Sequence, residues 1–384
     1  MALKAVHVSD VPSLDQPPEA PVVALSTSSR LCKGEGWENK AERLVVIGHR
    51  GKGMNALASP DPRLREVKEN SLRSFNEAAR FPIDFVEFDV QVTKDGCPII
   101  FHDDLILAEE EDGKISEKLV TDLSLEEFRS YGPQRDRTKA GKPLFRKAKD
   151  GRILNWAVNA DDSFCTLQEA FQGVDPCVGF NIELKFVDDV VYEDEELTRS
   201  LRATLRVVYE FANERPIIFS SFQPDAARLI RKLQNDHPVF FLTNGGTQIY
   251  GDVRRNSLDE GIKLCLANGL QGIVSEVKAI FGNPTAIARI KESKFALLTY
   301  GQLNNVPEAV YMQHLMGVNG VIVDLVQEIT EAVSEFISPD AEGDNKALCD
   351  AVEAKVKEAS RPKFSQHELS FLLRLIPQLV QQQQ

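Results

Sequence analysis

The sequence predicts an α/β protein whose parallel strands close into a (β/α)₈ TIM barrel. From residue 166 onward, short apolar segments alternate regularly with segments of helical spacing. Strands that are apolar throughout are buried on both faces, which is typical of a parallel sheet covered by helices. Nine candidate strands occur where eight close a barrel, so one is surplus or accessory. An open doubly wound sheet is the alternative, but no G-x-G-x-x-G follows the first strand.

The N-terminal part begins without a regular pattern. Residues 1–42 contain several prolines and little periodicity, which indicates an irregular extension or a transit-like segment. The apolar, β-branched run at 44–48 predicts the first buried strand. Glycines and prolines predict a loop over 51–68, and the apolar spacing after it predicts a helix over 71–80.

Two further strands and a long insertion are expected next. The strands are predicted at 85–90 and 98–102, separated by a turn at Lys94-Asp95-Gly96. A long insertion then covers about 103–165. Its one clear helix start is the capping box formed by Ser124 and Glu127.

The regular alternation starts at a second capping box, Thr166 with Glu169. Later helix starts are marked by Pro224, by Ser257 with Glu260, by Asn283-Pro284 and by Pro307. The strands expected between these helices are 180–185, 217–220, 239–242, 273–274, 295–299 and 321–323. Residues 43–337 are therefore expected to form the barrel domain.

The C-terminal part, 338–384, reads as a charged linker followed by an amphipathic helix over 365–380. We expect this helix to pack against the barrel. A docking element for a partner or a membrane surface is the alternative.

Composition excludes several classes of function. The net charge of -13 disfavours nucleic acid as a partner, since the phosphate backbone is itself anionic. No apolar run is long enough for stable membrane insertion. The 6 cysteines form no C-x-x-C pair, which disfavours a zinc site and fits a reducing compartment.

Charged residues recur at i and i+2 on two predicted strands. Glu87 and Asp89 share one face of their strand, and so do Glu183 and Lys185. Carboxylates that point together into a barrel repel each other, and a hard divalent cation relieves that repulsion. The alternative without function is that both pairs lie in solvent at the edge of a sheet. However, the carboxyl ends of parallel barrel strands meet at one mouth, where barrel enzymes build their active sites.

Two histidines and an arginine follow predicted strands. His49 and His102 suit an acid/base pair beside a metal, and Arg50 offers a guanidinium fork that matches a phosphate. This interpretation requires residues 90–97 to run back along the barrel in extended form. A tight hairpin there is expected to place His102 at the wrong end. Together the residues indicate phosphoryl chemistry rather than hydride or acyl transfer.

An ordered series of short motifs resembles the glycerophosphodiester phosphodiesterase family. The matching segments are 48–51, 69–71, 87–90, 93–96, 101–103, 181–185, 220–222 and 320–324, so the resemblance covers roughly 43–330. Segments 54–55, 243–246 and 299–301 look similar to the plant branch. Residues 3–9 resemble plastid-associated plant members, which implies the chloroplast; the acidic residues of the N-terminal segment favour the alternative, the cytoplasm.

The resemblance implies a role for each matching residue. Glu87, Asp89 and Glu183 match metal ligands for one divalent cation, Mg²⁺ first and Ca²⁺ as the alternative. His49 and His102 match the acid/base pair, and Arg50 and Lys185 match phosphate-binding cations. Glu69, Asn70, Phe222 and Tyr300 match supporting positions, with Tyr300 standing where the family usually has a tryptophan.

The implied reaction is hydrolysis of small glycerophosphodiesters, such as glycerophosphocholine, glycerophosphoethanolamine or glycerophosphoglycerol. The products are sn-glycerol 3-phosphate and the free alcohol, formed by direct attack of water or through a cyclic phosphate. Two alternatives stay open: a lysophospholipase-D-like activity on the same barrel, and an inactive barrel that only binds glycerophosphodiesters. The sequence leaves a homo-oligomer open as well.

Overall fold

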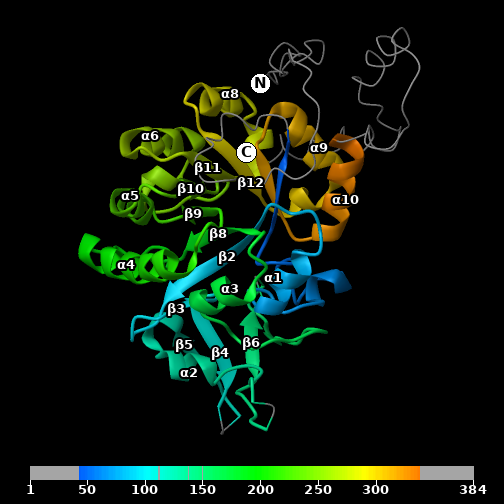
Figure 1. The fold of residues 1–384 in the computed structure, drawn as a ribbon, viewed down its shortest axis with the longest axis vertical. Coiled ribbons are helices and arrows are strands. Elements are labelled where there is room, and N and C mark those ends of the chain that lie inside the picture. Colours follow the sequence, from blue (N-terminus) through cyan, green and yellow to red (C-terminus); the bar gives the residue numbers. More distant parts are fainter. Residues whose placement is uncertain (1–42, 111–112, 137, 149, 338–384) are drawn as a thin grey trace, which may run out of the picture.

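The computed structural model describes residues 43–110, 113–136, 138–148 and 150–337. Within them, eight parallel strands close into a barrel, because β1 pairs with both β13 and β2 (Figure 1). The barrel order is β1 (Val45–Gly48), β13 (Gly320–Val323), β12 (Ala296–Tyr300), β11 (Gly272–Glu276), β10 (Val239–Thr243), β9 (Ile217–Ser221), β8 (Gly179–Leu184) and β2 (Phe85–Val92). The predicted barrel is confirmed. The expected segments 1–42 and 338–384 lie outside the described residues.

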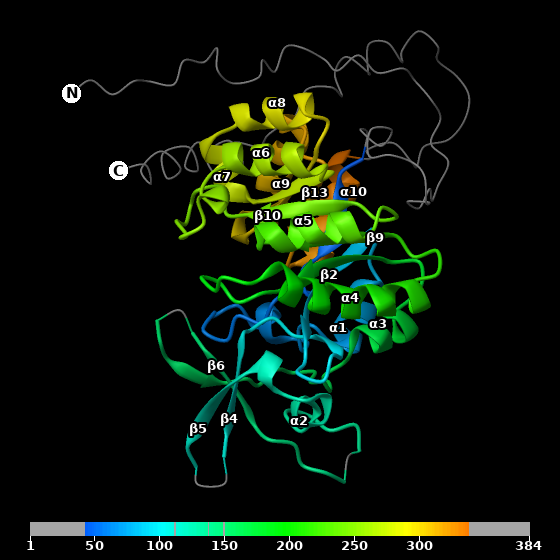
Figure 2. The ribbon, with the colours of Figure 1, turned by 90° about the vertical axis from the view of Figure 1, so that its left-hand side faces the viewer.

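Helices follow most barrel strands and cover the outside of the barrel (Figures 1 and 2). They are α1 (Leu72–Ala78), α3 (Leu167–Gly173), α4 (Asp194–Phe211), α5 (Pro224–Leu233), α6 (Leu258–Asn268), α7 (Val277–Gly282), α8 (Thr285–Glu292), α9 (Pro307–Met316) and α10 (Val326–Ile337). Several predicted starts are confirmed, since Thr166 and Glu169 make both bonds of a capping box and Pro224 and Pro307 are first helical residues. The main core lies between these helices and the outward faces of the strands.

The surplus strand is β3 (Pro98–Ile100), which pairs antiparallel with β2 in the register Val90 to Ile100. Residues 93–97 therefore form a tight hairpin, and the requirement that 90–97 run back without one was wrong. The hairpin nevertheless brings His102 to the mouth of the barrel. Because β2 continues past Asp89 to Val92, β3 returns to the level of Asp89, whose carbonyl accepts from the amide of Phe101 at 3.0 Å.

The insertion forms a second, antiparallel sheet that the sequence did not predict. It contains β4 (Leu105–Glu109), β5 (Ile115–Leu119), β6 (Leu144–Lys147) and β7 (Ile153–Asn155) in the order β5-β4-β6-β7, with α2 (Leu125–Arg129) beside it. The predicted capping box of α2 is confirmed. Figure 2 shows this sheet projecting from one side of the barrel.

An aromatic core joins the insertion to the β2–β3 hairpin. Phe101, which follows β3, packs edge-on against Phe128 and Phe164 at 5.8 and 5.2 Å between ring centroids. Trp156 belongs to the same buried cluster. The insertion is therefore packed on the hairpin that carries His102.

Candidate active site

Three buried carboxylates lie together at the carboxyl ends of β2 and β8. Glu87 and Asp89 share one face of β2, and Glu183 pairs with Asp89 in the sheet register. Oxygen atoms from the three side chains lie within 4.8 Å of one another. These are the three acids that the sequence singled out for a metal.

Burial disfavours having all three of these carboxylates ionised at once. Burial, followed by the nearby Asp89, raises the pKa of Glu87 to about 8, and burial also raises the pKa of Glu183. Within the described residues, Glu87 Oε1 and Asp89 Oδ1 are buried and accept no hydrogen bond. Oxygen donors with unused acceptor atoms fit a hard divalent cation such as Mg²⁺ or Ca²⁺.

Asp89 differs from its two neighbours because basic side chains surround it. Burial alone would raise its pKa, but His102, Arg50 and Lys185 outweigh burial and hold the pKa of Asp89 below its usual value. Asn70 Nδ2 also donates to Asp89 Oδ2 at 2.8 Å. The backbone of Asn70 adopts a left-handed conformation, with φ of 54°, so its placement is a strained and specific one.

His49 follows β1 and is oriented by a partner from the last barrel strand. Its Nδ1 lies 2.7 Å from Asp324 Oδ1, just beyond β13, and its Nε2 lies 4.0 Å from Glu87 Oε2. Asp324 is itself held by the amide of Met54 at 3.0 Å. Burial lowers the pKa of His49, but Asp324 more than compensates and raises the pKa above its usual value.

His102 has the opposite tendency, although a carboxylate orients it in the same way. Its Nδ1 lies 2.7 Å from Asp103 Oδ1. Burial, then the positive charges of Arg50 and Lys185, lower the pKa of His102 to about 4. The two histidines thus face one site with differently tuned imidazoles.

The two predicted phosphate-binding cations flank the acids. The Arg50 amide donates to Glu87 Oε2 at 2.9 Å, while its guanidinium donates to Glu69 Oε1 at 2.8 Å. The Arg50 backbone is left-handed, with φ of 50°. Lys185 Nζ lies 3.3 Å from Glu183 Oε1, so this cation also points into the barrel mouth.

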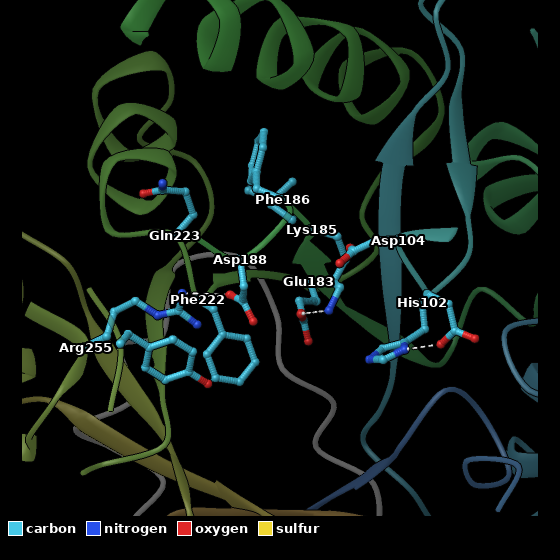
Figure 3. A pocket seen from close by; sticks show the side chains of 12 residues that line it. His102, Asp104, Glu183, Lys185, Phe186, Asp188, Phe222, Gln223 and Arg255 are labelled. Carbon is cyan, nitrogen blue, oxygen red and sulfur yellow. Dashed lines mark hydrogen bonds and ion pairs between the residues drawn. The ribbon is translucent and has the colours of Figure 1, made fainter. Parts of the chain in front are cut away.

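A cavity of about 370 Å³ opens at this mouth (Figure 3). Its lining includes His102, Glu183 and Lys185, with Arg255 on the side opposite His102. Phe222 also lines it, whereas Tyr300 packs edge-on against Phe222 at 6.0 Å without lining the cavity itself. Tyr300 therefore supports the Phe222 side of the cavity wall from behind and does not itself face the cavity.

Several residues of this site were not predicted. Asp324 stands at the end of a predicted strand, so the rule that singled out His49 could have found it. Arg146 comes from the insertion, Asp188 from a loop and Arg255 from a short 3-10 helix, and none of these places gives the strand-alternation signal of the barrel. Arg255 stacks on Tyr250 at 3.6 Å and pairs with Asp188 at 2.7 Å, which joins two loops of the mouth.

Comparison with known proteins identifies the family. The sequence model of the glycerophosphoryl diester phosphodiesterase family matches residues 49–328. This chain belongs to that family. It is 59% identical over 385 residues to a chloroplastic glycerophosphodiester phosphodiesterase of Arabidopsis thaliana, covering 99% of this chain and 100% of the relative. A second Arabidopsis glycerophosphodiester phosphodiesterase is 56% identical, with 99% and 100% covered.

Solved structures share the fold of this family member. A phosphodiesterase from Oleispira antarctica, determined in complex with the product sn-glycerol-3-phosphate, is similar with a TM-score of 0.53 and 19% identity, covering 76% of this chain and 97% of that one. A glycerophosphoryl diester phosphodiesterase from Silicibacter pomeroyi gives 0.57 and 19%, covering 77% and 95%. At this identity the likeness supports the barrel fold alone.

Proposed function

We propose that this chain is a metal-dependent glycerophosphodiester phosphodiesterase that releases sn-glycerol 3-phosphate and a free alcohol. The observation that carries the proposal is the convergence of three buried carboxylates, two carboxylate-oriented histidines and two cations at one barrel mouth. The high identity to relatives named glycerophosphodiester phosphodiesterases supports it.

The chain's own residues divide the work of this reaction. Arg50 and Lys185 would bind the phosphate oxygens, since both are permanent cations beside the acids. A divalent cation held by Glu87, Asp89 and Glu183 would neutralise charge that develops on those oxygens.

Proton transfer falls to the two histidines. Asp324 and Asp103 engage Nδ1 of His49 and His102, so Nε2 of each ring is left for proton transfer; the histidine that acts as base is neutral, and the one that acts as acid carries a proton on Nε2. One histidine takes the proton of the attacking hydroxyl, and the other donates a proton to the leaving alkoxide.

The cavity favours a small, polar alcohol over a lysolipid. It measures about 370 Å³ and its lining carries Asp104, Asp188, Lys185 and Arg255. An acyl chain would have to lie against these charged groups and displace their water without offering them a polar partner, which is costly. None of the described helices combines the length and apolar composition of a transmembrane span.

The decisive experiment uses the purified full chain with glycerophosphocholine and Mg²⁺ or Ca²⁺. We expect turnover to sn-glycerol 3-phosphate, its loss with EDTA and its return when the cation is added back. Lysophosphatidylcholine serves as the comparison substrate. Turnover of the lysolipid alone, or undiminished turnover in EDTA, would overturn the proposal.

Two finer assignments belong to the same proposal. We favour Mg²⁺ as the physiological cation. Higher turnover with Mg²⁺ than with Ca²⁺ at equal free concentration would support this choice. We also place the protein in the plastid, because the similar Arabidopsis enzyme is named chloroplastic. A fluorescent fusion to the C-terminus, imaged in plant cells, tests that location.

A further inference from the structure

We propose that Arg146, on β6 of the insertion, is a positioning residue that fixes both His102 and Arg50 for the reaction. The inference rests on the function proposed above. It also gives the antiparallel sheet a part in the active site, although that sheet lies outside the barrel.

The Arg146 guanidinium uses every one of its N–H groups. Nε donates to Asp103 Oδ2 at 2.7 Å, and NH2 donates to Asp103 Oδ1 at 3.1 Å and to Glu69 Oε1 at 2.6 Å. NH1 donates to Glu69 Oε2 at 3.0 Å and to the carbonyl oxygen of Asn55 at 3.1 Å. An arginine has five N–H donors in a rigid fork, and these contacts occupy all of them.

Each carboxylate that Arg146 holds is also bonded to a residue of the barrel mouth. Asp103 Oδ1 lies 2.7 Å from His102 Nδ1. Glu69 Oε1 accepts from Arg50 NH1 at 2.8 Å. One guanidinium thus bridges the carboxylate that orients the imidazole and the carboxylate that orients the phosphate-binding cation.

Burial makes this arrangement rigid. Glu69 is only 3% exposed, and Arg146 lies over the Trp156 ring at 3.6 Å from its centroid. The Trp156 indole in turn donates to Asn55 Oδ1 at 3.1 Å. Without Arg146, the buried Glu69 would depend on Arg50 as its remaining guanidinium partner, and that would draw Arg50 away from the phosphate.

Lysine cannot replace arginine here, because an ammonium is a point charge that cannot bridge two carboxylates with paired bonds. The test is therefore Arg146→Lys in the full chain. Its matched control is Arg129→Lys, because Arg129 also ties the insertion to the barrel, through Glu169 at 2.6 Å. Within the described residues, the Arg129 guanidinium bonds to Glu169 and not to either histidine or Arg50.

For Arg146→Lys we expect kcat on glycerophosphocholine to fall about 10- to 100-fold, the usual effect of losing a partner that orients site groups. Calorimetry should show weaker binding of sn-glycerol 3-phosphate in the presence of Mg²⁺, because Arg50 is no longer fixed. Arg129→Lys should keep both properties. Wild-type kcat in Arg146→Lys, or a loss explained entirely by its unfolded fraction in thermal melts, would overturn the inference.

A double variant tests whether Arg146 affects kcat through Asp103. If Arg146 acts through Asp103, then Arg146→Lys combined with Asp103→Asn loses less than the product of the two single losses. A loss equal to that product contradicts the inference. Inactivity of the wild-type chain would instead count against the proposed function. Comparing the binding of sn-glycerol 3-phosphate to wild type and to Arg146→Lys would still test the role of Arg146.

Discussion

At the scale of single residues, the site depends on how each side chain is held. His49 and His102 each have Nδ1 bonded to a carboxylate at 2.7 Å, yet Asp324 raises the pKa of His49 above its usual value, while burial and nearby cations lower the pKa of His102. The sequence placed both histidines at strand ends but not their partners. Asp103 is adjacent to His102, whereas Asp324 is separated from His49 by nearly the whole barrel and is brought close only when the barrel closes.

Replacing either of the two histidines proposed as acid and base should remove one proton-transfer step. His49→Ala and His102→Ala should each lower kcat about 10²- to 10⁴-fold, the usual contribution of a positioned acid or base. Steady-state kinetics on glycerophosphocholine checks this. His314→Ala, on the outer helix α9, is the control and should keep wild-type kcat. Near-normal turnover in both site variants would refute the assignment.

Lys68 gives a stability prediction with a definite sign. Burial lowers its pKa to about 8, and its Nζ, over Trp156 at 3.6 Å, donates no hydrogen bond within the described residues. Below pH 8 both the folded and unfolded states keep the proton, so the cost of charging is fully present. Between about pH 8 and 10.5 the unfolded state holds more protons, so the stability of the protein rises with pH.

Lys68→Met should remove that cost and flatten the profile. We expect the variant to be more stable than wild type at pH 7 by about 3 kcal/mol, and the difference to vanish above pH 10.5. Urea unfolding across this pH range measures it. Lys94→Met, at an exposed position, should keep the wild-type profile. A variant less stable than wild type at pH 7 would show that the cation–π contact outweighs burial.

At the scale of elements, the hairpin of β2 and β3 determines the position of His102 at the barrel mouth. The sequence predicted both strands but not their antiparallel pairing, because nothing in residues 85–92 shows that β2 continues past the rim of the barrel. The barrel helices were easier to predict, since capping residues such as Thr166 and prolines such as Pro224 mark their starts. The short strands of the insertion are half-exposed and carry no such signal.

Two phenylalanines in the shared aromatic core separate stability from function. Phe101→Ala and Phe128→Ala should each lower the free energy of unfolding by about 3–5 kcal/mol, because both rings are buried. Phe101 is adjacent to His102, so only Phe101→Ala should also lower kcat of the folded protein. Denaturant unfolding and kinetics at low temperature check the pair. Equal kcat in both variants would contradict this role of the hairpin.

At the scale of the whole molecule, the cation is expected to join two strands that belong to different parts of the chain. Asp89 and Glu183 are opposite each other on β2 and β8, with the insertion between them in sequence. The barrel and the three acids could be predicted because apolar strands and i, i+2 spacing reflect local physics. The link from the insertion through Arg146 could not, because it depends on tertiary packing alone.

Removing the metal should therefore lower the stability of the whole protein. A free Mg²⁺ concentration of about 100 Kd should stabilise the folded chain by about 2.7 kcal/mol. Glu87→Gln should lose most of this gain, while its metal-free form should be at least as stable as metal-free wild type, since burial already disfavours the charged form of Glu87. Thermal melts with EDTA or Mg²⁺ test both points. Glu276→Gln, at the end of β11, is the control and should keep the full gain.

The pairing of β2 with β8 also has a consequence for the order of events during folding. The register of Asp89 with Glu183 requires closing a loop that contains the hairpin, the insertion and α3. Such long loops add little to equilibrium cost, about 0.6 kcal/mol per doubling of length, but contacts between distant residues form slowly. We therefore expect the cation site to assemble late in folding, so bound Mg²⁺ should slow unfolding without accelerating refolding. Stopped-flow rates of folding and unfolding, with and without Mg²⁺, would reveal which of the two rates depends on the cation.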